Sequence, residues 1–260
     1  MNLIMEMPKY NAELNRGTGL VQETLILLGA YKLGMSKQEM TKKAIEEDIL
    51  VKVLNKRIKD IVEVVFYKRY VNSDPNVPIY LNYIVQHFSS LDVITQLFLT
   101  YTVRANTILK DFITQVYWPE VRKGIRTIDS KLAKKFITDS IKQPGLIAGW
   151  SDSTQKRVAS YLIATLVDFR FLDKDRNVKP VFLHDSAANY IAHELHFKGF
   201  SDSTIVDADE WKIFGYTRLD TLKHLERISF QGHFILQNSG EILRINWKYK
   251  NMQEFTHAIR

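Results

Sequence analysis

Several features that would define a functional class are absent from this 260-residue sequence. It has no cysteine, which excludes disulfides, thiolate metal sites and zinc fingers. It has no run of about eighteen or more apolar residues, so we expect no membrane span. The short start, interrupted by Pro8, does not resemble a secretory signal. These absences fit a reducing cytoplasm, which is the expected location.

The motifs of catalysis and cofactor binding are also missing. Gly17-Thr18-Gly19 lacks the following Gly-Lys-Ser/Thr of a Walker loop, and no Rossmann, kinase or nucleophile-elbow pattern occurs. His193 and His196 stand at i and i+3, whereas a zincin places its histidines at i and i+4, so an ordinary helix face explains them better. We therefore predict a non-enzymatic protein that has no cofactor and no metal site.

Positive charge and an ordinary apolar content are what the sequence does have. The apolar fraction of 45% is sufficient for a buried core, and the length allows one large domain or two of ordinary size. The formal net charge is +7. This balance favours a polyanionic partner, which could be DNA, RNA or an acidic protein.

The N-terminal half reads as a series of helices. The first spans Val21–Leu33 with Gly34 as its C-cap, and the capping box Ser36–Glu39 opens the second. The third helix has apolar residues at steps of three and four, namely Val51, Leu54, Ile58, Ile61 and Val65. A second face of it carries basic residues, among them Lys52, Lys56 and Arg57. Two short helices and a longer basic one resemble a helix-turn-helix unit, although a solvated face of a helical bundle gives the same pattern.

A junction is expected near the middle of the chain. Three apolar helices, approximately at 79–88, 91–103 and 107–118, form the core of the N-terminal half. Pro119–Thr127 then breaks the helical pattern. This break predicts two domains, a helix-turn-helix-like domain over residues 1–125 and a winged-helix-like domain over residues 126–260.

The stretch from Gly149 to Phe171 predicts a helix with an unusually polar start. Ser151 is suited to be its N-cap, and an apolar stripe follows from Val158. The first turns carry hydrogen-bond donors, two of them cationic: Ser153, Thr154, Gln155, Lys156 and Arg157. Donors at a positive helix N-terminus suit the backbone or base edges of a nucleic acid. Capping chemistry alone also accounts for the first of these residues.

A helix capped at Asp129 or Ser130, the helix from Ser151, the polar turn Asp173–Asn177 and a short extended return have the order of a small winged-helix unit. The C-terminal part repeats the order of helices followed by extended chain. Helices are expected near residues 185–197, 207–214 and 218–227. The runs His233–Gln237 and Glu241–Trp247 flank the turn Asn238-Ser239-Gly240 and predict a hairpin. Three helices and a hairpin indicate a winged helix. In it, Thr217–Lys223 is the helix presented to the DNA, and Arg244 lies near the wing. The predicted fold class is therefore mainly α, with one C-terminal β-hairpin.

These pieces together resemble the BrxA family of BREX phage-defence systems. The resemblance is carried by the Gly17–Gly29 segment, the basic helix near Lys56 and Arg57, the helices from Ser89 to Phe112, and Trp150-Ser151-x-Ser153-Thr154-x-Lys156-x-Val158. It extends over about residues 15–200. It implies a helical, non-enzymatic protein that binds double-stranded DNA beside the methyltransferase, ATPase and phosphatase-like components of the defence complex.

The sequence therefore favours binding of duplex DNA, mainly through phosphates. Two alternatives stay open: a protein-interaction scaffold of the defence complex without nucleic-acid activity, and an RNA-binding protein. Target sequence, oligomeric state and direct protein partner do not follow from the sequence. From charge and position, the candidate DNA-contacting residues are Lys52, Lys56, Arg57, Ser151, Ser153, Thr154, Lys156, Arg157, Thr217, Arg218, Lys223 and Arg244.

Overall fold

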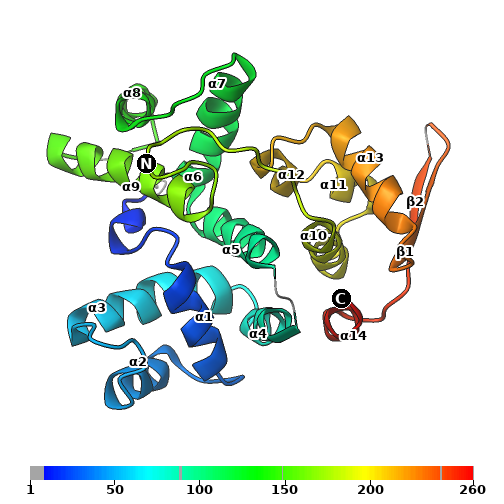
Figure 1. The fold of residues 1–260 in the computed structure, drawn as a ribbon, viewed down its shortest axis with the longest axis horizontal. Coiled ribbons are helices and arrows are strands. Elements are labelled where there is room, and N and C mark those ends of the chain that lie inside the picture. The colour runs from blue at the N-terminus through cyan, green and yellow to red at the C-terminus, as the bar shows by residue number, and fades with distance from the viewer. Residues whose placement is uncertain (1–8, 88–89, 148, 241, 260) are drawn as a thin grey trace, which may run out of the picture. The chain divides into compact units, whose positions relative to one another are not determined.

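The structure is a computed structural model that describes residues 9–87, 90–147, 149–240 and 242–259, and in these the chain is mainly helical (Figure 1). The sheet formed by the described residues is one antiparallel hairpin near the C-terminus. The predicted fold class is thus confirmed. Four parts of the chain that the sequence analysis used lie outside the described residues: the start at 1–8, the helix end at Phe88, the start of a family feature at Ser89, and the strand start at Glu241.

The chain forms two compact units, each built from two segments. The first unit comprises residues 1–75 and 101–181, and the second comprises residues 76–100 and 182–260. The predicted boundary between 125 and 126 falls inside the first unit, because residues on both sides of it share one core. For example, the buried Tyr117 hydroxyl donates to the Phe171 carbonyl at 3.1 Å, and the two rings are 5.2 Å apart.

The first unit is a set of helices around an aromatic core. Phe66, Tyr70, Tyr101, Phe112 and Tyr117 are all fully buried. A 3-10 turn at Glu13–Arg16 precedes the helices, and α5 (Leu91–Ala105) enters the unit at Tyr101. The other helices are α1 (Val21–Ala30), α2 (Lys37–Glu46), α3 (Asn55–Lys59), α6 (Thr107–Phe112), α7 (Trp118–Arg122), α8 (Ser130–Ile141) and α9 (Asp152–Asp168). Two π-helical stretches extend them: Asp60–Val71 continues α3, and Ile113–Tyr117 joins α6 to α7.

The start of the predicted third helix is wrong. The helix begins at Asn55, and Val51 and Leu54 are 68% and 81% exposed instead of facing the core. Lys52 has a φ of +60°, a left-handed conformation that no α-helix continues through. From Ile58 onward the predicted apolar stripe is buried as expected.

The predicted break over Pro119–Thr127 is present but begins later, after Arg122. Pro119 lies in the first turn of α7, directly after the π-helical stretch Ile113–Tyr117, and its missing N–H removes one hydrogen bond without ending the helix. The helical path from Thr107 therefore continues to Arg122. The chain turns afterwards at Gly124, whose φ of +85° suits glycine.

Helix ends with local capping signals agree better with the sequence. The capping box of α2 is present, since Ser36 accepts from the Glu39 N–H at 3.2 Å and its own N–H donates to the Glu39 carboxylate at 2.7 Å. The helix before it ends at Ala30, earlier than predicted. Gly34 is not its C-cap but has a φ of +83° in the turn that precedes Ser36.

The Gly17-Thr18-Gly19 turn is held between two distant parts of the first unit. The buried Arg69 guanidinium donates to the carbonyls of Gly17 and Gly19, at 2.8 and 3.3 Å. The Gly19 N–H donates to the Asp168 carboxylate at 2.7 Å. A Cβ at Gly19 would stand 2.5 Å from the Asp168 Cβ, so no larger residue fits there without a shift. This turn therefore joins the segment before α1 to Arg69 and to the end of α9.

Substituting Gly19→Ala is expected to destabilise the first unit by about 1–3 kcal/mol, because the added methyl overpacks a contact between backbone and side chain. Chemical denaturation followed by circular dichroism measures this loss. Gly29→Ala is the matched control, since Gly29 is helical and nothing lies within 4 Å of its added Cβ. That variant should be neutral or more stable by up to about 1 kcal/mol. Equal effects of the two changes would contradict the tight packing at Gly19.

The second unit combines helices with the hairpin. Its helices are α4 (Val77–His87), the first part of α5, α10 (Asp185–Phe197), α11 (Asp202–Val206), α12 (Asp209–Ile213), α13 (Arg218–Ser229) and α14 (Met252–Ala258). Strands β1 (Phe234–Asn238) and β2 (Leu243–Trp247) pair with Leu236 opposite Ile245. Phe234 and Ile245 are buried from one face of this hairpin. The predicted hairpin is thus confirmed.

Candidate nucleic-acid interface

Residues 118–179 of the first unit run in the order helix, short bridge, two helices and paired return. After α7, Thr127 bridges Asn177, and after α9, Leu172 bridges Val178, both in antiparallel fashion. Backbone hydrogen bonds from Val178 N to the Arg126 carbonyl (2.8 Å) and from Lys179 N to the Phe171 carbonyl (2.9 Å) fix this arrangement. Helices α8 and α9 pack directly on each other. We call the turn at 173–177 the first-unit wing.

The polar start of α9 is a tightly built helix cap. The Ser151 hydroxyl accepts from the Thr154 N–H at 3.3 Å, which confirms Ser151 as the N-cap. The same oxygen lies 2.9 and 3.0 Å from the hydroxyls of Ser153 and Thr154. Gln155 donates to the Trp150 carbonyl at 3.1 Å. The hydroxyls therefore satisfy one another, and most of the predicted donors are already used.

The same cap occurs a second time in the chain. Residues 149–154 read Gly-Trp-Ser-Asp-Ser-Thr, and residues 199–204 read Gly-Phe-Ser-Asp-Ser-Thr. At the start of α11, Ser201 accepts from the Thr204 N–H at 3.4 Å and lies 3.3 and 2.9 Å from the hydroxyls of Ser203 and Thr204. A motif that serves two helices in the same way is primarily a capping device. The case for an anionic partner at α9 therefore rests on its cations.

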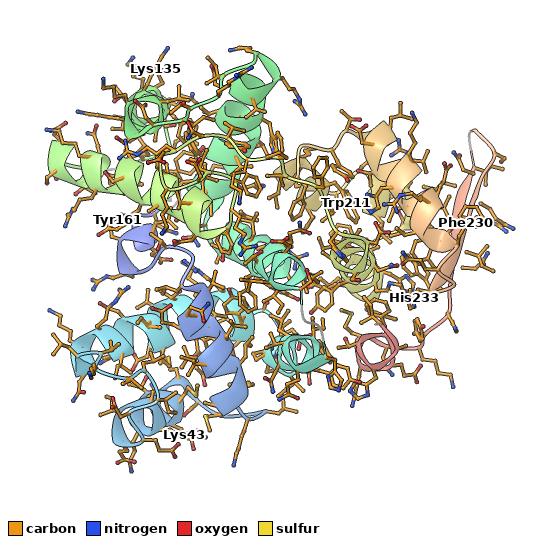
Figure 2. All side chains as sticks on the ribbon, in the orientation of Figure 1. Lys43, Lys135, Tyr161, Trp211, Phe230 and His233 are labelled. Carbon is orange, nitrogen blue, oxygen red and sulfur yellow. The ribbon has the colours of Figure 1, made fainter. Side chains whose placement is uncertain are left out.

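Those cations differ in how free they are. Asp152 accepts from Lys156 at 2.7 Å and from Lys134 of α8 at 3.0 Å, and these hydrogen bonds hold the pKa of its carboxyl below the usual value. Lys156 is therefore partly neutralised. Arg157 is exposed, and its guanidinium makes no hydrogen bond or ion pair with another described residue. Two more lysines project outward from α8, Lys131 and Lys135, the latter visible in Figure 2.

The first-unit wing adds cations that the sequence reading missed. Lys174 and Arg176 are exposed there and line a shallow groove of about 320 Å³ together with Ser130 of α8 and Ser160 of α9. Asp173 of the same turn is engaged locally, because it accepts from the Asn177 N–H at 2.8 Å and from its side-chain amide at 2.9 Å. From the sequence, this polar turn lies between a capped helix and a short extended return, the order of a small winged-helix unit. Its two cations were not among the predicted contacts, and the bridges place them beside α9.

The charge of the protein is concentrated in this part of the chain. Residues 122–179 contain 13 lysines and arginines against 6 aspartates, a net of +7, which equals the net charge of the whole chain. The first unit as a whole has 27 basic and 18 acidic residues. The second unit has 9 basic and 11 acidic residues and is net negative.

The other predicted residues of the first unit lie on or just before α3. Lys52 and Lys56 are exposed. The Arg57 guanidinium instead donates to the Arg16 carbonyl, so it helps to hold the 3-10 turn. Further along this helical stretch, Lys68 pairs with Glu13, whereas Lys59 is exposed. Among the three predicted residues, Lys52 and Lys56 are therefore the freer cations.

The four predicted residues of the second unit lie around the start of α13 and the hairpin. Thr217 caps α13, and Asp220 completes a capping box with it. Arg218 is ion-paired with Asp207. Lys223 and Arg244 are exposed. Arg218 and Arg244 line a groove of about 540 Å³ between α11, α13 and the hairpin.

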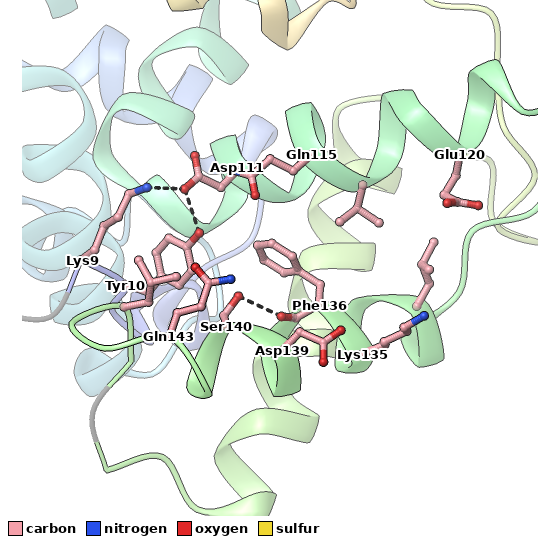
Figure 3. A pocket seen from close by; sticks show the side chains of 13 residues that line it. Lys9, Tyr10, Asp111, Gln115, Glu120, Lys135, Phe136, Asp139, Ser140 and Gln143 are labelled. Atoms are coloured by element: carbon pink, nitrogen blue, oxygen red, sulfur yellow. Dashed lines mark hydrogen bonds and ion pairs between the residues drawn. The ribbon is translucent and has the colours of Figure 1, made fainter.

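A cavity of about 290 Å³ in the first unit has a different character (Figure 3). The buried Asp111 carboxylate accepts there from Lys9 at 2.6 Å and from the Tyr10 hydroxyl at 2.7 Å. Burial and the adjacent Asp111 carboxylate raise the pKa of Tyr10. Glu120 and Asp139 add two further carboxylates to the lining. Three carboxylates disfavour phosphate, so this cavity is not the candidate interface.

The histidine pair of α10 belongs to the core. His193 is fully buried, and its ring stacks on Phe255 with centroids 3.7 Å apart. His196 stacks on Trp247 at 4.4 Å. In the described ranges, no group of three or more His, Cys, Asp or Glu side chains is arranged to hold a metal ion. Nor does any helix among those residues combine the length and apolarity needed to cross a membrane.

Comparisons with known proteins place the chain in a family. The family model for BrxA matches residues 8–194. Among solved structures, the chain is similar to an uncharacterized protein from Magnetospirillum magneticum, with a TM-score of 0.60 and 22% identity, covering 73% of this chain and 95% of that one. This likeness shows a shared fold. No curated protein matches the chain.

Proposed function

Because the chain belongs to the BrxA family, its role lies with BREX phage defence, and we propose that within this role it binds double-stranded DNA through its first unit. It acts as a binding protein and not as an enzyme. The observation that carries the proposal is the concentration of positive charge in residues 122–179. The phosphate backbone of DNA binds such a surface favourably, because each lysine or arginine that contacts a phosphate releases counterions from the DNA.

The order of elements is one that can place this positive charge against a DNA duplex. A helix, two packed helices and a paired return is the order in which winged-helix proteins place a presenting helix and a wing. Helix α9 occupies the position of the presenting helix, and Arg157 lies in its second turn. The positive end of the helix dipole adds to Lys156 and Arg157 there. Lys174 and Arg176 of the first-unit wing provide the adjacent phosphate contacts.

Mainly electrostatic binding follows from these residue types. Lys156 is ion-paired with Asp152. Arg157 therefore provides the stronger contact with phosphate at the helix start. Lys52 and Lys56 of the same unit supply flanking charge. The hydroxyls of Ser151, Ser153 and Thr154 position the helix start through the cap, and they reach phosphate only as secondary donors. Little of this argues for strong base specificity.

The test is binding of a random-sequence duplex, measured by fluorescence anisotropy. If about four phosphates are contacted, affinity should fall about a hundredfold between about 50 and 200 mM salt. Reversing two of the cations, in the variant Arg157→Glu/Arg176→Glu, should weaken binding by a further factor of ten or more, roughly, and flatten the salt dependence.

The matched control reverses the same number of charges in the second unit, in the variant Lys223→Glu/Arg244→Glu. We expect it to bind duplex DNA within about threefold of the wild type, because a net-negative unit contributes few phosphate contacts. Absence of binding by the wild type would contradict the proposal. Equal losses in the two variants would remove the assignment to the first unit. Stronger binding of a duplex RNA of the same length would transfer the proposal to RNA.

A further inference from the structure

The groove between α11, α13 and the hairpin of the second unit has features that DNA binding does not explain. Its floor and rim bring together Leu222, Ile242 and Leu243 with Arg218 and Arg244. The volume of about 540 Å³ accommodates several side chains. We call it the α13–hairpin groove.

Two exposed apolar residues lie in the lining of this groove or next to it in the chain. Leu219 at the start of α13 is 57% exposed, and Ile242 at the hairpin turn is 62% exposed. Helix α9 of the first unit has an equivalent place in the order of elements, and its exposed face carries Ser153, Lys156, Arg157 and Ser160. The two presenting helices therefore offer different chemistry. One offers donors and charge, and the other offers hydrocarbon flanked by arginine.

Acidic residues around the groove oppose a phosphate backbone. Asp207 pairs with Arg218, and Asp220 lies exposed in the first turn of α13. Asp202 accepts from the Ile245 N–H at 2.9 Å, so its carboxylate faces the edge of β2. With the unit as a whole net negative, a polyanion gains little here. A ligand with both apolar and acidic side chains avoids this difficulty, because it needs only one or two carboxylates.

We propose that the α13–hairpin groove binds a short segment of a partner protein in which acidic and large apolar side chains alternate closely. The apolar side chains pack on Leu222, Ile242 and Leu243, and a carboxylate pairs with the Arg244 guanidinium in bidentate fashion. Arg218 is already paired with Asp207 and serves as a second, weaker partner. An arginine beside exposed aliphatic side chains is a typical centre of a protein interface.

The segment binds through its side chains and does not extend the sheet. Strand addition to β2 requires free backbone donors along that edge. The Ile245 N–H is occupied by Asp202. The partner backbone therefore gains no ladder there, and recognition depends on which side chains the segment carries. This inference does not depend on DNA binding by the first unit.

The experiment starts from random peptides displayed on phage and selected on the full-length protein. Selected peptides should be enriched in Asp or Glu next to Leu, Ile or Phe. One of them, synthesised with a fluorophore, is then titrated with variants. Arg244→Glu and Ile242→Ser should each weaken its binding roughly tenfold or more, since each removes a central contact at an exposed position where folding is not at risk.

Two controls separate this site from the DNA surface. Lys248→Glu reverses a charge on the same hairpin outside the groove lining and should change peptide affinity by less than about twofold. The first-unit variant Arg157→Glu/Arg176→Glu should leave peptide binding unchanged even if it abolishes DNA binding. The proposal is overturned if no acidic and apolar sequence is enriched, or if Arg244→Glu and Ile242→Ser bind the peptide like wild type. It is also overturned if duplex DNA displaces the peptide and Arg244→Glu loses DNA affinity, which would make the groove a DNA site.

Discussion

Replacing Arg69 with methionine is expected to lower the free energy of unfolding of the first unit by about 2–4 kcal/mol. The side chain is 4% exposed, and its guanidinium donates to the carbonyls of Gly17 and Gly19. Methionine replaces the aliphatic part of the arginine side chain, but it is shorter and leaves the space of the guanidinium empty. It leaves both carbonyls without their charged donors, and a buried acceptor that loses its partner carries the full cost of desolvation.

Burial lowers the pKa of the Arg69 guanidinium, but arginine remains charged at neutral pH. Removing a buried charge recovers part of the desolvation cost, which is why the expected loss is not larger. The consequence is also local. Without these donors the Gly17–Gly19 turn loses one of its two anchors and keeps only the bond from Gly19 to Asp168.

Chemical denaturation measures the loss in stability, and hydrogen exchange at the amides of α1 locates it. Arg157→Met is the matched control, because it makes the same chemical change at an exposed position and should alter stability by no more than about 0.5 kcal/mol. If Arg69→Met proved no more destabilising than Arg157→Met, the guanidinium would not be what holds the turn.

The features that the sequence predicted correctly depend on hydrogen bonds between near neighbours. The Ser36–Glu39 capping box and the Ser151 cap each close within three residues, so the residue types at fixed spacing are sufficient. The hairpin is similar, because a turn centred on Gly240 joins two runs that pair directly. Such signals need no knowledge of the rest of the fold.

The errors occur where distant contacts decide. Val51 and Leu54 fit a helical repeat, yet the left-handed Lys52 prevents the helix from starting before Asn55. The division into units follows contacts such as Gly19 with Asp168, which are 149 residues apart in the chain. A pattern in a window of a few turns contains no record of such pairs. Pro119 misled for a related reason, since its effect depends on its position within a helix.

The candidate interface shows the same division. Lys156 and Arg157 were found because they follow a visible cap. The partial neutralisation of Lys156 was not foreseen, because Asp152 also binds Lys134 from another helix. The turn that carries Lys174 and Arg176 was predicted as part of a winged-helix order, but its cations were not predicted as contacts, because the bridges at 127–177 and 172–178 that hold them beside α9 join distant residues. Local sequence identifies charges, and tertiary structure decides which of them form one surface.

The second large effect is expected on acidification, through the buried His193 of the second unit. Its Nδ1 lies 2.8 Å from the Asn189 carbonyl, and its ring stacks on Phe255. Burial lowers its pKa to about 3. The ordinary value is about 6.5. A charged imidazole has no counter-ion in this aromatic core, so the folded state holds it neutral.

The sign of the effect follows from which state binds the proton. Between pH 6.5 and pH 3 the unfolded chain protonates His193 and the folded chain does not. Unfolding is therefore favoured as the pH falls, by about 1.4 kcal/mol per pH unit, or about 3 kcal/mol at about pH 4.5. Full stability from this group is present above about pH 6.5. Burial also lowers the pKa of His196 and His233, which adds to the loss in the same direction.

Hydrogen exchange at the amides of α10, corrected for the intrinsic rate at about pH 7 and about pH 4.5, measures this loss in the second unit directly. His193→Phe should reduce the dependence by about 1.4 kcal/mol per pH unit, because phenylalanine keeps the ring stack and cannot titrate. His257→Gln, at an exposed position of α14, should leave the dependence unchanged. The Asn189 carbonyl also accepts the helical N–H of residue 193, so it keeps a hydrogen bond when phenylalanine replaces the imidazole. A wild-type dependence retained in His193→Phe would assign the acid response to the other histidines, and would mean that the folded state already admits a proton at His193.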